Sequence, residues 1–306
     1  MITTVPIKNE KDIAVPDKTV LVLGYFDGVH KGHQKLFEVA TKASMKDYLP
    51  VVVMTFTESP KLALQPYHPD LMLHIVNHQE REQKLKWHGV EELFLLDFSS
   101  KFASLTAQEF FDTYIKALKP AIIVAGFDYT FGSDKKTADD LKDYFDGEII
   151  IVPPVEDEKG KISSTRIRQA ILDGDVREAG HLLGTPLPSR GMVVHGNARG
   201  RTIGYPTANL VLRDRTYMPA DGVYVVDIEV QRQKYRGMAS VGKNVTFDGE
   251  EARFEVNIFD FSDDIYGESV TVYWLDRVRD MVKFDSVEEL VDQLQKDEEI
   301  ARNWES

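Results

Sequence analysis

The sequence predicts two domains of different fold class: an α/β domain with a parallel sheet, then a mainly antiparallel β domain that ends in a long helix. The chain has 306 residues, of which 42% are hydrophobic, and it is too long for one ordinary core. Its first half alternates short β-branched runs with helical patterns, whereas the runs after about Gly191 are short, alternating and separated by turns. The segment 183–188, LGTPLP, predicts the boundary, because a glycine can end a helix and two prolines stiffen the exit. Domains are therefore expected at 1–184 and 185–306.

In the first half, five apolar runs have the length and composition of buried strands. These are residues 19–23, 51–56, 93–96, 122–125 and 149–152. Helical periodicity between them predicts helices at 34–43, 79–88 and 106–118. Strands and helices that alternate at this spacing form a parallel sheet wrapped by helices, and ligands bind such sheets at the carboxyl ends of the strands.

In the second half, the pattern is that of an antiparallel sandwich or barrel. The expected strands are residues 191–194, 222–230, 235–241, 252–259 and 269–275. Residues 286–303 then form an acidic amphipathic pattern, which predicts one long helix that packs against the rest of the domain.

Charge and composition exclude several classes of function. The formal net charge is −13, so the surface should repel polyanions, and neither nucleic acid nor a membrane is expected as a partner. The chain has no cysteine, which removes disulfides, thiolate metal sites and a cysteine nucleophile. Neither a signal peptide nor a membrane-length apolar run is seen, so a soluble protein of the cytoplasm is expected.

The segment 24–34, GYFDGVHKGHQ, follows the first predicted strand and opens the first predicted helix. The start of a helix offers unpaired N–H groups to a phosphate, and Gly24 and Gly28 let the backbone approach a ligand closely. His30 and His33 can both face one phosphate and donate to oxygens that gain charge in a transition state. A surface turn with two solvated histidines is the simpler interpretation, but the whole pattern in this place favours a nucleotide site.

Two more segments of the first half suit phosphate or nucleotide binding. GFDYTFG at 126–132 follows a predicted strand. ISSTRIR at 162–168 opens a helix, where Ser164 and Thr165 can cap the helix or bind phosphate and Arg168 can clamp an oxygen. An ordinary helix cap followed by solvated arginines is the alternative for the second segment.

The segment 195–210, HGNARGRTIGYPTANL, is the most informative part of the second half. Its glycines and arginines can present N–H groups and positive charge to a polyphosphate. Thr207 and Asn209 lie two residues apart, so an extended backbone places both on one face. Their neutral oxygens suit Mg²⁺ when a nucleotide supplies the negative charge. A plain basic turn before a strand is the alternative.

A carboxylate on a later strand completes the second candidate site. In RFEVNIF at 253–259, alternation places Glu255 and Asn257 on the face opposite Phe254 and Val256. A carboxylate that is held on a rigid strand can accept the proton of an alcohol. By itself, Glu255 could equally be a solvated strand residue.

Together these segments resemble the prokaryotic bifunctional riboflavin kinase/FAD synthetase family, over nearly the whole chain. The resemblance implies a Rossmann-like nucleotidyltransferase domain and a β-barrel kinase domain, with Mg²⁺ as cofactor and with ATP, riboflavin and FMN as substrates. In the first domain it implies ATP contacts from Gly24, Phe26, Gly28, His30, His33, Ser164, Thr165 and Arg168, and nucleotide or flavin contacts from Phe127 and Asp128. In the second it implies ATP contacts from Gly196, Arg199, Arg201, Gly204, Thr207 and Asn209, metal ligation by Thr207 and Asn209, flavin contacts from Arg277 and Arg279, and Glu255 as base.

Four residues depart from the pattern of the family. Ser59 and Asn257 stand where a histidine is usual. In the segment 240–247, Lys243 and Val245 are atypical of the family. Ser59 motivates one alternative, a riboflavin kinase whose first domain adenylylates weakly or not at all. A second alternative is a non-catalytic sensor of flavin or nucleotide, against which the retention of Glu255, Thr207 and Asn209 argues. The sequence leaves the oligomeric state open.

Overall fold

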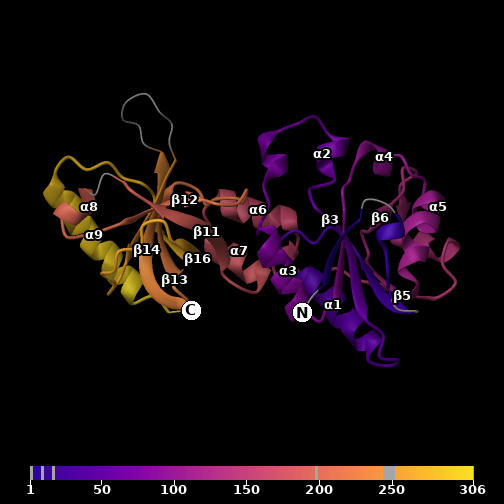
Figure 1. Ribbon diagram of the computed structural model, residues 1–306. Coiled ribbons are helices and arrows are strands. Elements are labelled where there is room, and N and C mark those ends of the chain that lie inside the picture. The colour runs from indigo at the N-terminus through magenta and orange to yellow at the C-terminus, as the bar shows by residue number, and fades with distance from the viewer. Residues whose placement is uncertain (1–2, 8–9, 16–17, 197–198, 244–251, 306) are drawn as a thin grey trace. The chain divides into compact units, whose positions relative to one another are not determined.

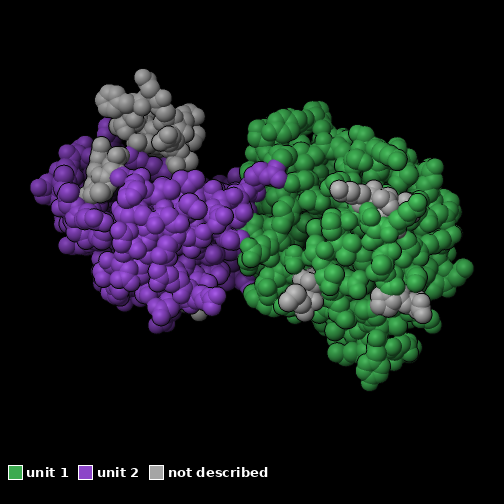
Figure 2. Space-filling model, viewed as in Figure 1, with its two compact units in different colours: residues 1–163 green, residues 164–306 purple. Residues whose placement is uncertain are grey.

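The computed structural model describes the chain except residues 1–2, 8–9, 16–17, 197–198, 244–251 and 306. The fold divides into two compact units, residues 1–163 (unit 1) and 164–306 (unit 2), which Figure 2 shows in green and purple. This division falls earlier in the chain than residue 184. The helices that follow residue 163 therefore belong to the same compact unit as the strands of the second half.

Unit 1 is built on a six-stranded parallel sheet in the order β1-β4-β3-β2-β5-β8 (Figure 1). The strands are β1 (Thr3–Ile7), β2 (Thr19–Leu23), β3 (Val51–Phe56), β4 (Glu92–Leu96), β5 (Pro120–Gly126) and β8 (Glu148–Val152). The expected α/β class is confirmed, but the sequence missed β1. Pro6 has no N–H and argues against a central strand, yet it is tolerated here because β1 pairs on one side only, with β4.

Apolar cores cover both faces of this sheet. Every residue of β2 is buried, and its side chains alternate between two clusters: Leu21 and Leu23 lie in one, Val20 and Val22 in the other. This explains why the strand is a continuous apolar run in the sequence, since a strand that is buried on both faces has no polar side to show.

The helices and short strands of unit 1 depart in part from the sequence pattern. The main helices are α1 (Lys31–Ser44) and α3 (His78–Trp87), with short pieces α2 (Lys61–Leu64), η2 (Pro69–Met72), α4 (Ser100–Ala103) and α5 (Ala107–Phe110). The helix expected at 106–118 is regular only over α5 and continues as a π-turn, Phe111–Ile115, and a 3₁₀ turn, Lys116–Leu118. The remaining elements are the 3₁₀ turns Glu10–Asp12 and Ala138–Asp143 and the strands β6 (Thr130–Phe131), β7 (Lys136–Thr137), β9 (Glu156–Asp157) and β10 (Gly160–Lys161).

Unit 2 is a closed antiparallel barrel in the order β11-β12-β15-β14-β13-β16 (Figure 1). Its strands are β11 (Leu187–Val194), β12 (Ala208–Leu212), β13 (Gly222–Val230), β14 (Gln233–Lys243), β15 (Ala252–Ile258) and β16 (Ser269–Arg279). The choice between sandwich and barrel that the sequence left open is thereby settled. The strand β12 was not among the expected ones.

The helices in the described part of unit 2 are α6 (Ser164–Leu172), α7 (Val176–Leu183), the short α8 (Arg199–Thr202) and the long terminal α9 (Val287–Arg302). The helix α7 packs on β16 and β11, and α9 packs on β14, β13 and β16. The long acidic helix is thus confirmed within one residue at each end of its expected range. In the described part of the chain, no helix is long and apolar enough to cross a membrane.

Candidate functional sites on the sheet and the barrel

The turn that follows β2 has an unusual backbone. Phe26 (φ 58°), Gly28 (φ 83°) and Val29 (φ 49°) all have left-handed conformations, which are costly for the two side-chain-bearing residues. Both of those side chains are buried and hold the turn in place. A Cβ on Gly24 would lie 2.6 Å from the Phe26 ring, so this position requires glycine. The turn therefore depends on Gly24, because only a residue without a side chain leaves room for the Phe26 ring.

This turn brings the two predicted histidines face to face at the start of α1. The rings of His30 and His33 stack with centroids 3.6 Å apart and planes 17° from parallel. His30 caps the helix, because its Nδ1 accepts the N–H of His33 at 3.3 Å. The Nδ1 of His33 is buried and has no hydrogen-bond partner among the described residues. A polar atom of this kind suits a site that a ligand completes.

Both histidines are neutral at physiological pH. Burial lowers the pKa of His30 to about 4, although the Asp27 carboxylate acts in the opposite direction. Burial, and then the neighbouring His30 and Lys161, hold the pKa of His33 well below its usual range. Each ring can therefore donate one hydrogen bond to a phosphate oxygen, but neither supplies a full positive charge.

A positively charged lysine that the sequence pattern did not point to lies close to both histidines. Lys161 ends β10, its Nζ lies 2.5 Å from Asp128 Oδ2, and it stands 4.5 Å over the centre of the Phe127 ring. It is also close enough to lower the pKa of both histidines. Its place directly before the ISST segment was the signal that could have found it.

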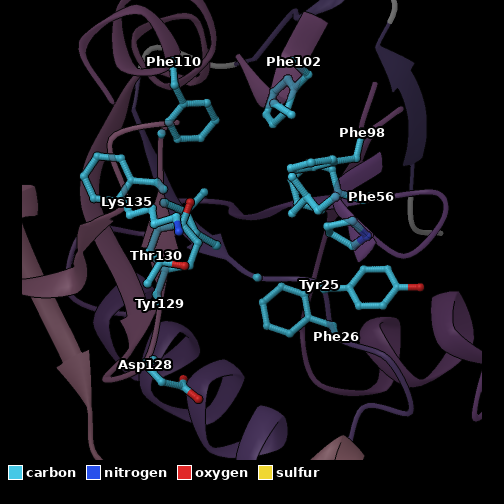
Figure 3. Close-up of a pocket in the computed structure, with 18 of the residues that line it drawn as sticks. Tyr25, Phe26, Phe56, Phe98, Phe102, Phe110, Asp128, Tyr129, Thr130 and Lys135 are labelled. Atoms are coloured by element: carbon cyan, nitrogen blue, oxygen red, sulfur yellow. The ribbon is translucent and has the colours of Figure 1, made fainter. Parts of the chain in front are cut away.

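An aromatic cavity of about 640 Å³ opens beside His33 at the carboxyl ends of the strands (Figure 3). Its wall includes Tyr25, Phe26, Phe56, Phe98, Phe102, Phe110, Asp128, Tyr129, Phe131 and Lys135. The rings of Phe56 and Phe98 pack edge to face with centroids 4.9 Å apart, and those of Phe98 and Phe102 are tilted with centroids 5.2 Å apart. The sequence pattern did not predict this cavity, because its rings come from strands, helices and turns that are far apart in the sequence. A cavity of this size and lining suits a flat, fused aromatic ring system.

The predicted phosphate segment begins unit 2. Ser164 and Thr165 form the first turn of α6, and Arg168 lies one turn further along the same helix and is half-buried. The neighbouring Arg166 is engaged in an ion pair with Glu178 of α7. The three predicted residues therefore share one end of one helix, as expected for a segment that binds phosphate together.

On the barrel, three predicted side chains meet where β12 pairs with β15. Asn209 stands directly opposite Glu255 in the register of the two strands. Thr207 lies just before β12, and its hydroxyl donates to Glu255 Oε2 at 3.4 Å. Phe254 and Val256 point into the barrel, which leaves the half-buried Glu255 on the outer face. These contacts join a carboxylate to two neutral oxygen ligands, a set that suits Mg²⁺ in the presence of a polyphosphate.

Asn257 has a defined place in this arrangement. Its side chain is buried, and its Nδ2 donates to the Pro206 carbonyl at 2.7 Å. Through this bond, β15 holds the residue that precedes Thr207. Asn257, at the position where a histidine was expected, therefore supports the PTAN segment with a hydrogen bond from its side-chain amide.

Two glycines let the loop before β12 close on itself. A Cβ on Gly196 would lie 2.3 Å from Asn209 Nδ2, and one on Gly200 would lie 2.1 Å from the Tyr205 carbonyl oxygen. Gly204 has φ 85°, a conformation that favours glycine. Residues 197–198 lie outside the described residues, and so does the side chain of Arg199.

A second cavity of about 500 Å³ lies beside this loop. It is lined by Val193, Arg201, Pro206, Thr207, Ala208, Val256, Ile258, Phe261, Ser262, Asp263, Asp264, Ile265 and Tyr266. Near it, the ring of Tyr266 stacks on His195 with centroids 3.8 Å apart. The structure thus brings Arg201 and Thr207 to one cavity, as expected if both contact one ligand.

The structure gives the two predicted flavin arginines bonds within the protein. Arg279 makes a bidentate ion pair with the fully buried Asp297 of α9, with the nearest atoms 2.7 Å apart. Arg277 donates to the carbonyl oxygens of Asp173 at 3.2 Å and Asp221 at 2.7 Å. Both side chains therefore tie helices or loops to β16, and flavin binding by them stays a prediction. Of the two atypical loop residues, Lys243 ends β14 and Val245 lies outside the described residues.

Two histidines at a helix start on a parallel sheet, and a carboxylate beside two neutral oxygen side chains on a barrel, are the sites expected of one class of protein, the ATP-dependent transferases that carry two separate sites on one chain. The family model described as FAD synthetase matches residues 12–166, and the one described as riboflavin kinase matches 183–305. The chain belongs to the bifunctional riboflavin kinase/FMN adenylyltransferase family. Because both halves match, a kinase with an inactive first domain and a non-catalytic sensor are not favoured.

Relatives support this membership over more than nine-tenths of the chain. The bifunctional riboflavin kinase/FMN adenylyltransferase of Listeria monocytogenes is 39% identical, and the match covers 92% of this chain and 91% of that protein. That of Bacillus subtilis is 38% identical, over 93% and 92% respectively. A crystal structure described as a macrolide-efflux protein from Streptococcus pneumoniae is 81% identical, with a TM-score of 0.97, over 99% of this chain and all of that one.

Proposed function

We propose that the barrel phosphorylates riboflavin to FMN and that the sheet domain adenylylates FMN to FAD, with ATP as donor in both reactions. The observation that carries this proposal is the meeting of Glu255 with Thr207 and Asn209 on paired strands. Phosphoryl transfer to an alcohol needs a base and a neutralised polyphosphate in the same place. Family membership supplies the flavin as the substrate class.

In the kinase reaction, Glu255 takes the proton of the terminal ribityl hydroxyl as its oxygen attacks the γ-phosphorus of ATP and ADP leaves. Thr207 and Asn209 would hold Mg²⁺, which neutralises charge on the phosphate oxygens when it is bound. Asn257 fixes the PTAN segment through the Pro206 carbonyl. We place ATP along Gly196, Arg199, Arg201 and Gly204, with the cavity beside Arg201 as its pocket.

In the adenylyl reaction, a phosphate oxygen of FMN attacks the α-phosphorus of ATP, and pyrophosphate leaves. The attacking oxygen is already anionic, so no base is needed, and positioning with charge neutralisation carries the rate. His30 and His33 donate hydrogen bonds as neutral rings, and Lys161 supplies positive charge. Ser164, Thr165 and Arg168 are proposed to bind the leaving pyrophosphate.

The aromatic cavity is the proposed place of the flavin ring in unit 1. Its rings offer stacking faces and edges, and it opens next to His33. Phe127 is 42% exposed and Asp128 lines the cavity, so these two can contact the nucleotide or flavin at its rim.

One assay with two variants tests both assignments. Purified protein is given riboflavin, ATP and Mg²⁺, and the flavins are separated by chromatography. Glu255→Gln should stop FMN formation but leave FAD formation from supplied FMN intact, because the two sites are separate. Replacement of both His30 and His33 with alanine should do the reverse. An equal loss of both activities in either folded variant would contradict the assignment.

The boundary between the two activities is also part of the proposal. We assign 1–184 to adenylylation and 185–306 to phosphorylation, although α6 belongs to the compact unit of the barrel. The family matches leave 167–182 to neither activity. The expected cytoplasmic location, and the absence of nucleic-acid and membrane partners, stay predictions.

A further inference from the structure

Three side chains form a compact cluster in unit 1 that the two transfer reactions do not use. Glu58 follows β3, His74 lies in the segment before α3, and His78 is the first residue of α3. One ligand atom from each, a carboxylate oxygen and two imidazole nitrogens, lie within 4.8 Å of one another. In the described part of the chain, this is the one group of three such side chains that is so close.

The distances are near those that a bound metal ion imposes. His74 Nε2 lies 3.1 Å from Glu58 Oε2, and His78 Nε2 lies 4.0 Å from Glu58 Oε1. Metal–nitrogen and metal–oxygen bonds of roughly 2.0–2.2 Å at tetrahedral angles place ligand atoms about 3.3–3.5 Å apart. The exposed His78 ring is the ligand that would have to move closer to Glu58 when an ion binds. We propose that Glu58, His74 and His78 bind one divalent transition-metal ion of the Zn²⁺ type.

The central ligand is already held in a suitable orientation. His74 is 4% exposed, and its Nδ1 lies 3.3 Å from the Tyr25 hydroxyl, so its Nε2 faces Glu58. The next residue is fixed as well, because the Ile75 N–H donates to Asp27 Oδ1 at 3.0 Å. A second hydrogen bond on the far ring nitrogen is usual for a metal-binding histidine, because it sets the tautomer.

Charge and donor type select the kind of ion. The Glu58 and Asp27 carboxylates outweigh the single Arg81 guanidinium nearby, so a dication is accommodated. Arg81 now donates to His78 Nδ1 at 3.3 Å, and this bond must be given up when Nε2 binds a metal and Nδ1 carries the proton. Imidazole nitrogens favour Zn²⁺, Co²⁺ or Ni²⁺ over Mg²⁺, which distinguishes this site from the one proposed on the barrel.

An ion at this place would act on the wall of the aromatic cavity. Glu58 lies between Phe56 and Pro60, which both line the cavity, and Figure 3 shows Phe56 and Tyr25 at its edge. Binding would join the segment after β3 to the start of α3. It would therefore stabilise unit 1 and fix the position of that wall, without contact with the reacting atoms.

Metal titration of the full chain tests the site directly. Tag-free protein is treated with a chelator, desalted and titrated with Zn²⁺ by calorimetry, and its melting temperature is measured with and without Zn²⁺. Co²⁺ gives a second readout, because a tetrahedral site absorbs visible light strongly and the chain has no cysteine to contribute to the band. The variants are His78→Ala and the isosteric Glu58→Gln. His68→Ala is the matched control, since His68 is an exposed histidine that lies 3.3 Å from the carboxylate of Asp70.

The proposal expects one equivalent of Zn²⁺ to bind to the wild type and to His68→Ala, with a rise in melting temperature. Binding to His78→Ala and Glu58→Gln should be weaker by about tenfold or more, with no such rise. Equal affinities in wild type and His78→Ala would overturn it, as would a lack of Zn²⁺ binding by the wild type or an equal loss in His68→Ala. None of these outcomes depends on flavin turnover, so they leave the proposed function untouched.

Discussion

Asn257 and Lys161 each act on a candidate site through a contact with a distant part of the chain. Strand alternation puts Asn257 on the same face of β15 as Glu255, but Asn257 is buried, and its side chain donates to the Pro206 carbonyl. The role of Asn257 was not readable, since its partner, the Pro206 carbonyl, is far away in the sequence. The same holds for Lys161, whose effect on the two histidines depends on how β10 approaches α1.

Asn257→Ala should lower kcat/KM of the kinase by about tenfold. The change removes a buried donor and leaves the Pro206 carbonyl without its bond, which costs about 1–3 kcal/mol at a segment that must position Thr207. Asn257→Asp should be as poor, because it has the same shape but donates no hydrogen bond. FAD formation from supplied FMN is the internal control. Wild-type kinase activity in the aspartate variant would refute the positioning role.

The buried, neutral His30 makes the stability of unit 1 depend on pH. Its pKa is about 4 in the folded chain and near 6.5 in the unfolded one, so the unfolded state binds more protons between these values. Stability is therefore full above about pH 6.5 and falls as the pH drops toward 4. At pH 5 the loss from this residue alone is about 2 kcal/mol relative to pH 7.

Hydrogen exchange of the β2 amides measures this loss, because β2 lies in the centre of unit 1. In His30→Asn, which keeps a helix-capping side chain but cannot titrate, the protection of β2 should fall less between pH 7 and pH 5. An identical decline in both proteins would show that His30 is not the group responsible.

Among the secondary-structure elements, those that an apolar run defines were predicted correctly, and those that depend on pairing with a distant strand were not. The strands β2 and β3 begin and end where the apolar runs predict, because continuous burial leaves a continuous apolar signature. The strand β1 was not predicted, because Pro6 interrupts its apolar pattern, and β12 appeared only in the alternative interpretation of the PTAN segment, because Pro206 directly precedes it. The helix expected at 106–118 loosens to a π-turn after Phe110 and then tightens to a 3₁₀ turn, and Phe111, Ile115 and Leu118 are buried along it.

The loop around α8 should not tolerate a side chain at its glycine. Gly200→Ala would bring a methyl group 2.1 Å from the Tyr205 carbonyl oxygen, so the loop must open. The KM of the kinase for ATP should rise at least about tenfold, while adenylylation stays unchanged. Gly180→Ala in α7 is the matched control, since a Cβ there meets only ordinary contacts at 3.6 Å and alanine favours a helix. An unchanged KM in Gly200→Ala would contradict the closed loop.

At the scale of the whole molecule, the fold class predicted for each half is correct, but the compact units divide before α6. Val176, Ala179, Leu182 and Leu183 of α7 are fully buried, and this helix packs on β11 and β16. The sequence pattern near residue 184 predicts where α7 ends, because a glycine and two prolines follow it. It does not predict which hydrophobic core the helix packs against.

Fragments test where the units divide. A fragment of residues 1–184 should expose the apolar face of α7 and bind a hydrophobic dye, whereas a fragment of 164–306 should not and should unfold cooperatively. Dye fluorescence and urea unfolding measure both properties. A 1–184 fragment that binds no dye, beside a 164–306 fragment that fails to fold, would place α6 and α7 with the sheet instead.

The closed ring of strands has a consequence for behaviour in a crowded solution. In the closed barrel every strand has two neighbours, so it has no edge strand to which a strand of another molecule could pair. The open sheet of unit 1 has two edge strands, β1 and β8. Unwanted self-association through strand addition should thus start at those two outer strands. At one of them, Pro6 already removes an amide that such growth would need.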